Sequence, residues 1–190
     1  MGMPIRRRVT PQEYLAIERS ADRRSQYVDG EIYAMAGATR RHNLITLSVG
    51  STLRLQLKGR PCEVYVNDMR VKVSKPGMYT YPDVVVVCGM PQFEDDEMDT
   101  LVNPTVVIEV LSPTTEAHDR GDKAEHYRRL DSLKEYVLIA QDRPLVERYV
   151  RQPNDEWVFS EAYESDSMVH VSSIDCELRV SEIYSQIKFV

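Results

Sequence analysis

Two carboxylates stand where the chain is otherwise strongly apolar. Asp83 follows Pro82 at the entrance of the run DVVVVC, and Glu109 lies inside the run TVVIEVL. Continuous apolar runs of this length are typical of central strands that are covered on both faces. A glutamate in such a strand loses its hydration, so it needs a cation, a basic side chain or a shared proton as compensation. Asp83 and Glu109 are therefore the first candidates for a functional site.

If the two strands pair, both carboxylates can reach one hard divalent cation. Mg²⁺ binds through one or two carboxylates and keeps water molecules for a phosphate substrate, and Mn²⁺ could substitute for it. Lys123, in the segment DRGDK, begins a predicted helix on the chain that leaves the Glu109 strand. A lysine beside two metal-binding acids can orient an attacking water and neutralise charge on a pentavalent phosphate.

The elements that must position these residues alternate between helices and strands. Thr10, Pro11 and Glu13 form a capping-box start for the first helix, and Asp29-Gly30 predicts a tight hairpin. The pattern predicts one α/β domain over residues 1–190. Its helices are expected at about 10–24, 40–58, 119–130 and 180–187, and its strands at CEVYVN, MRVKVS, DVVVVC, TVVIEVL, EYVLIA, LVERYVR and EWVFSEAY.

The net charge limits how this protein can contact nucleic acid. The 190 residues carry 24 Lys and Arg against 30 Asp and Glu, a formal net charge of -6. A chain that acidic does not coat nucleic acid non-specifically, so any DNA contact requires a local basic patch. The arginines at 6–8, 23–24, 40–41 and 128–129 could together supply one, whereas the acidic segment from Glu94 to Asp99 is interpreted as an exposed insertion.

Cysteine usage and hydropathy give a predicted location. Cys62, Cys88 and Cys176 are isolated in sequence and odd in number, which argues against a disulfide framework and a zinc site. No run approaches about 18 consecutive apolar residues, which excludes a transmembrane helix. We expect a cytoplasmic protein.

The block YPDVVVV, followed by TVVIEVLSPTTEAHDRGDKAEHYRRLDSLKEYVLI, resembles the Uma-type family of restriction endonucleases in the PD-(D/E)XK nuclease superfamily. The resemblance extends from about Thr10 to Ile187 and includes DGEIYAMAGATRRHNLI. It implies a restriction-endonuclease-like core, with a mixed β-sheet flanked by helices and added antiparallel strands. It also implies a Mg²⁺-dependent site that hydrolyses DNA phosphodiester bonds with a metal-activated water. A homodimer is expected by analogy with endonucleases that cut both strands of a symmetric site.

The resemblance assigns roles residue by residue. The PD motif falls on Pro82-Asp83 and the acid of the second motif on Glu109, so these two carboxylates are the implied metal ligands. The superfamily lysine is expected two residues later, where this sequence has Leu111. Lys123 is the matching candidate for a lysine supplied by the following helix. Glu31 resembles an extra acid that many members add from an earlier element, and it completes the implied catalytic set.

Two further side chains have a functional and a structural interpretation. His42, at a predicted helix start, could contact a phosphate or the water of the metal site, or it could cap the helix or face solvent. Tyr127 lies four residues after Lys123 on the same helical face, so it could position the lysine or pack in the core.

Two other functions remain open on the sequence alone. Leu111 and the acidic net charge would also fit a catalytically degenerate DNA-binding or protein-interaction module that keeps the nuclease fold. An enzyme acting on another phosphodiester, such as RNA, is the third hypothesis, because one fold can host varied chemistry.

Overall fold

The computed structural model describes residues 8–73 and 77–189 of the chain. Its helices are α1 Pro11–Ser20, α2 Arg40–Gln56, α3 Glu116–Arg120, α4 Asp122–Arg128 and α5 Val180–Ile183, with a short 3₁₀ helix, η1, at Ser172–Ile174. Its strands are β1 Ser25–Val28, β2 Glu31–Ala34, β3 Cys62–Val66, β4 Arg70–Val73, β5 Met78–Thr80, β6 Val84–Cys88, β7 Thr100–Leu101, β8 Val106–Leu111, β9 Glu135–Ala140, β10 Val146–Arg151, β11 Trp157–Ala162, β12 Met168–Val171 and β13 Cys176–Arg179.

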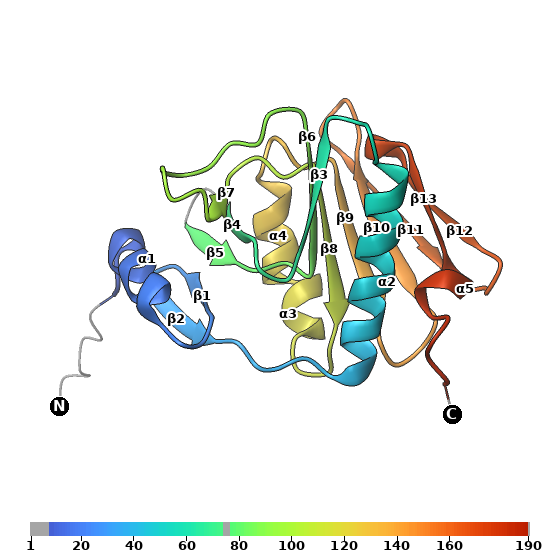
Figure 1. The fold of residues 1–190 in the computed structure, drawn as a ribbon, viewed down its shortest axis with the longest axis horizontal. Coiled ribbons are helices and arrows are strands. Elements are labelled where there is room, and N and C mark those ends of the chain that lie inside the picture. Colours follow the sequence, from blue (N-terminus) through green and yellow to red (C-terminus); the bar gives the residue numbers. More distant parts are fainter. Residues whose placement is uncertain (1–7, 74–76, 190) are drawn as a thin grey trace.

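A mixed six-stranded sheet forms the centre of the fold, with the strand order β11-β10-β9-β8-β6-β3 (Figure 1). The parallel pair is β8 and β9, and the other neighbours run antiparallel. β6 and β8 are the strands expected from continuous apolar runs, and both are buried on both faces; β9, expected only as a strand, is buried in the same way. The expected fold class, a mixed sheet flanked by helices, is confirmed.

Alternation along these strands sends their side chains into two separate cores. Val84 and Ile108 pack with α2, β12, β13 and α5 on one face of the sheet. Val85 and Val107 pack on the opposite face with α4 and with strands β4, β5 and β7, which belong to a second, five-stranded sheet. Figure 1 shows α2 and the pair α3 and α4 on opposite sides of the central strands. Glu109 follows the parity of Val107, so its side chain lies on the α4 face.

The second sheet has five strands in the order β2-β1-β5-β4-β7, and α1 packs against it. Tyr14, Tyr27 and Tyr79 form an aromatic cluster between α1 and strands β1 and β5. The hairpin expected at Asp29-Gly30 is confirmed as the connection of β1 to β2, with positive φ at both turn residues.

The acidic segment is not simply an exposed insertion, so that expectation was wrong in part. Asp99 is paired with Arg19 at 2.8 Å and with Arg70 at 2.6 Å, and Glu94 is paired with Lys72 at 2.5 Å. These ion pairs attach the segment to α1 and β4. These ion pairs could not be predicted from the sequence, because the basic partners lie between 22 and 80 residues away from the acids along the chain.

Helix boundaries also differ from the sequence expectations. α1 keeps its capping box but ends at Ser20 rather than near Arg24, since β1 begins at Ser25. The helix expected over 119–130 is two short helices, divided at Gly121, which has φ −97° and ψ −107°. A Cβ at Gly121 would lie 3.0 Å from the carbonyl oxygen of Ala117, so the break suits glycine.

Near the C-terminus, α5 ends at Ile183, and the hairpin of β12 and β13 was not foreseen. These strands are short, and β13 leads directly into α5.

The expectation that the cysteines form no disulfide was wrong. Cys62 and Cys88 face each other in the register of β3 and β6, with Cα atoms 4.1 Å apart, and they form a disulfide. Cys176 is buried and free. Counting sequence spacing missed the bond because sheet pairing, not sequence proximity, brings the two residues together. The cysteine count therefore does not support the cytoplasmic location, which stays a prediction. Within the described residues, no helix is long and apolar enough to cross a membrane.

Candidate active site

Asp83 and Glu109 meet because β6 and β8 pair antiparallel. The register joins Val84 to Ile108 and Val85 to Val107, and one further step places Asp83 opposite Glu109 on the same face. The backbone N–H of Val110 donates a hydrogen bond of 2.7 Å to Oδ2 of Asp83. That bond holds the first carboxylate against the strand that carries the second.

Glu109 is a buried acid with two donors on α4. Its side chain is 5% exposed, and its Oε1 lies 2.7 Å from Nζ of Lys123. The hydroxyl of Tyr127 donates to the same oxygen at 3.1 Å. Burial raises the pKa of Glu109 well above its usual range, and the neighbouring carboxylates of Asp119 and Asp83 raise it further, while Lys123 opposes the shift.

Lys123 lies between two carboxylates rather than one. Its ammonium is 2.7 Å from Glu109 and 3.2 Å from Oδ1 of Asp119, and all three side chains are at most 5% exposed. Burial by itself would lower the pKa of Lys123, but Glu109 and Asp119 outweigh it and raise that pKa above its ordinary value. Lys123 therefore stays charged.

Asp119 was not identified as a site residue from the sequence. It lies four residues before Lys123, near the end of α3, and the hydroxyl of Tyr136 donates to its backbone oxygen at 3.0 Å. The i,i+4 spacing of an acid and a lysine was the available signal. On an exposed helix the same spacing marks an ordinary surface ion pair, so only burial distinguishes Asp119.

His42 reaches the cluster from the opposite side of the sheet. Its Nε2 lies 3.2 Å from Oδ2 of Asp83, and it sits in the first turn of α2, which is capped by the side chain of Thr39. Thr39 in turn donates to the buried Gln141, just after β9, at 2.5 Å. The solvent-facing alternative for His42 is therefore wrong, since its side chain is 14% exposed.

Two expectations concern residues that lie away from the buried cluster. Glu31 is on β2, at the edge of the five-stranded sheet, where it is exposed and accepts a hydrogen bond of 2.6 Å from Tyr33. The structure does not bring it to Asp83 and Glu109. Leu111, which occupies the place of the strand lysine, is buried in the α4-side core. Lys123 enters the same region from α4 instead.

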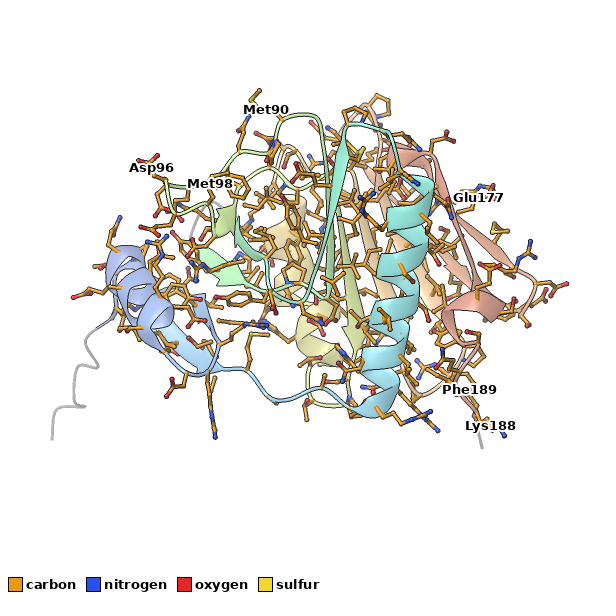
Figure 2. The ribbon with its side chains drawn as sticks, in the orientation of Figure 1. Met90, Asp96, Met98, Glu177, Lys188 and Phe189 are labelled. Atoms are coloured by element: carbon orange, nitrogen blue, oxygen red, sulfur yellow. A yellow bond between two sulfur atoms is a disulfide. The ribbon has the colours of Figure 1, made fainter. Side chains whose placement is uncertain are left out.

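The arginine pairs differ in their relation to the site. Arg40 and Arg41 open α2 directly before His42, and Arg41 donates to the backbone oxygen of Lys188 at 3.1 Å. Figure 2 shows Lys188 and Phe189 near the start of α2, and the Arg41 guanidinium lies 5.7 Å from the Phe189 ring centroid. Arg24 and Arg129 are instead paired with nearby acids.

The charges of the cluster fit a divalent cation. Glu109 and Asp119 both contact the single ammonium of Lys123, and Asp83 lies close enough to affect the pKa of both Glu109 and Lys123, so three acids share one lysine in a region largely shielded from water. Oxygen donors of this kind suit a hard cation such as Mg²⁺. Among the described residues, no group of three or more His, Cys, Asp or Glu side chains is arranged to hold a metal ion. A cation at this site would therefore have only Asp83 and Glu109 as its protein ligands.

Comparison with known proteins identifies the family of this chain. Residues 11–181 match the Uma2 family, described as "Putative restriction endonuclease". The chain is 34% identical over 164 residues to the uncharacterized protein sll1609 of Synechocystis sp., covering 86% of this chain and 93% of that protein. It is 30% identical over 182 residues to the uncharacterized protein slr1290 of the same organism, covering 96% and 94%.

A solved structure supports the same fold. The crystal structure of "a putative nuclease belonging to DUF820" from Anabaena variabilis superposes with a TM-score of 0.74 at 20% identity, covering 93% of this chain and 98% of that one. The fold and the family match together define a protein of the restriction-endonuclease-like class. The chain belongs to the Uma2 family.

Proposed function

We propose that this protein is a metal-dependent endonuclease that hydrolyses DNA phosphodiester bonds. Asp83 and Glu109 would hold Mg²⁺, and Lys123 would orient the attacking water and stabilise the charge that develops on the phosphate. The observation that carries the proposal is the 2.7 Å contact of Lys123 with Glu109. Leu111 occupies the usual place of the superfamily lysine, and Lys123 contacts Glu109, the acid of the second motif, from α4 instead.

The composition of the cluster argues against a purely structural role. A buried ion pair is often no more stable than apolar residues of the same volume, so stability alone does not explain it. A structural ion pair would also need only one acid for one base. Here Lys123 contacts both Glu109 and Asp119, Asp83 is a third acid nearby, and burial disfavours the charged form of Glu109. A bound cation would favour the charged form of Glu109 and balance the charge of the additional acids.

Each group would have a distinct part in hydrolysis. Asp83 and Glu109 would hold the divalent cation, which when bound would supply Lewis acidity that lowers the pKa of water and offsets charge on a phosphate oxygen. The hydroxyl of Tyr127 and the N–H of Val110 fix one oxygen of each carboxylate. Lys123, which stays charged, brings a hydrogen-bond donor and a positive charge to the reacting phosphate.

DNA is the substrate that the family membership favours, and the basic groups near the site agree with it. Arg40 and Arg41 precede His42, whose ring contacts Asp83. In a protein of net charge -6, such a pair brings local positive charge to the start of α2, next to His42, which would favour contacts with phosphate groups. A homodimer, which would cut both strands of a symmetric site, stays a prediction.

The test is cleavage of supercoiled plasmid in Mg²⁺ and in Mn²⁺. We expect the wild type to nick or linearise the plasmid and to lose this activity in EDTA. Asp83→Ala and Glu109→Ala should each abolish cleavage. Glu31→Ala is the matched control, because this exposed acid lies outside the cluster, and it should cleave as the wild type does.

Two outcomes would contradict the proposal. Cleavage that survives both Asp83→Ala and Glu109→Ala would come from another site or from a contaminant. Absence of cleavage, with DNA still bound, would favour the degenerate binding module. A parallel assay on single-stranded RNA distinguishes the substrate, since preferential RNA hydrolysis would overturn DNA specificity while leaving the site assignment intact.

A further inference from the structure

In the proposed nuclease, a cation would compete with the side chains of α4 for the carboxylate of Glu109. It would bind the cation. However, its Oε1 already forms an ion pair with the Lys123 ammonium at 2.7 Å and accepts a hydrogen bond from the Tyr127 hydroxyl at 3.1 Å. An ammonium and a divalent cation at one carboxylate repel each other. Lys123 therefore needs a second anionic partner when Glu109 binds a cation.

We propose that Asp119 is a positioning residue that holds the Lys123 ammonium so that Glu109 can bind the cation. This inference rests on the proposed function, because it presupposes the cation. The distances fit a lysine shared by two carboxylates, at 2.7 Å from Glu109 and 3.2 Å from Asp119. A small shift toward Asp119 would release Glu109 without leaving the ammonium unpaired.

Asp119 is placed firmly enough for this role. Its side chain is 5% exposed, so solvent does not compete with it for the lysine. Its backbone oxygen accepts from the Tyr136 hydroxyl at 3.0 Å, which attaches the end of α3 to β9. The division of α3 from α4 at Gly121 keeps Asp119 and Lys123 on separate short helices that face the same buried acid.

The need for such a residue follows from where the lysine comes from. A lysine on the strand, at the position of Leu111, would be held by the backbone of β8 itself. Lys123 instead comes from α4 and is buried, and its flexible side chain requires an anchor besides the carboxylate that it serves. Asp119, four residues earlier near the end of α3, provides that anchor.

The experiment is a four-protein binding cycle on the full chain, with no cleavage assay. The wild type, Asp119→Asn, Lys123→Met and the double variant are stripped of metal and titrated with Mn²⁺, and the half-saturating concentration is taken from the unfolding temperature. With Lys123 present, we expect Asp119→Asn to raise that concentration about tenfold. In the Lys123→Met background, we expect the same substitution to change it by less than about threefold, because no ammonium then competes at Glu109.

Two controls separate positioning from general charge effects. Asp119→Glu keeps the charge and should restore most of the affinity for Mn²⁺. Asp122→Asn removes an acid whose side chain is 82% exposed in the same segment, and it should leave the affinity unchanged. If Lys123→Met does not fold, Lys123→Gln takes its place in the cycle.

Each contradicting result has its own meaning. An equal loss of Mn²⁺ affinity in both backgrounds would mean that Asp119 acts on the cation directly or through its charge. No loss in either background would mean that Asp119 does not affect Lys123. Both results would overturn this inference and leave the proposed function standing. A wild type that Mn²⁺ does not stabilise would overturn both, and that titration alone reveals it.

Discussion

Replacing Lys123 by methionine tests whether the buried charge cluster exists as described. The substitution keeps most of the side-chain volume and removes the ammonium from between Glu109 and Asp119. Lys123 and both acids are at most 5% exposed, so water cannot replace the lost partner. Removing one member of a buried ion pair costs about 3–5 kcal/mol. We expect a loss of that size in the free energy of unfolding at neutral pH without metal.

The assay is urea unfolding followed by circular dichroism, with Lys134→Met as the matched control. Lys134 is an exposed lysine that donates to a backbone oxygen in the loop before β9, and its substitution should change stability by less than about 0.5 kcal/mol. Added Mn²⁺ should restore part of the loss in Lys123→Met. A loss below about 1 kcal/mol, equal to that of the control, would refute the buried ion pair and the role built on it.

Three further predictions concern individual contacts. Tyr127→Phe removes a hydroxyl that donates to the buried Glu109 carboxylate, and it should cost about 2 kcal/mol in urea unfolding; an unchanged midpoint would contradict that bond. Arg19 and Arg70 lower the pKa of Asp99 against the opposing effect of burial. A lowered carboxyl pKa stabilises the fold above the unfolded value near 3.8 and less as pH falls further. Asp99→Asn should therefore be destabilised at pH 7, and its deficit should shrink below about pH 4; a deficit independent of pH would contradict the ion pairs. Reduction of the disulfide that joins β3 to β6 should lower stability by about 3 kcal/mol, which comparison of melting with and without dithiothreitol measures; equal melting would mean that the bond contributes nothing.

The central strands could be predicted from the sequence because strands that are buried on both faces consist of consecutive apolar residues. DVVVVC and TVVIEVL are apolar at successive positions since both faces of β6 and β8 are covered. Glu109 is the one charged residue in the run TVVIEVL, and for that reason it could be identified from the sequence. The pairing of β6 with β8, which joins Asp83 to Glu109, could be stated only as a condition, because register depends on the whole sheet.

Contacts between distant elements were beyond sequence reasoning. Asp119 is an ordinary acid until α4 and β9 bury it, and the bond between Cys62 and Cys88 appears only once β3 lies beside β6. The position of Glu31 was taken from a resemblance, and the structure places that side chain on an exposed edge strand. In each case the missing information was which elements become neighbours.

The most direct test of the central claim is a thermal-unfolding titration of the wild type and Glu109→Ala with Mg²⁺ and Mn²⁺. A cation that binds only the folded wild type raises its unfolding free energy by about 2.7 kcal/mol at a concentration 100 times the Kd. We expect that stabilisation in the wild type and its loss in Glu109→Ala. No stabilisation of the wild type, with Glu109→Ala as stable or more stable, would mean that Glu109 is a structural residue and that the site holds no metal.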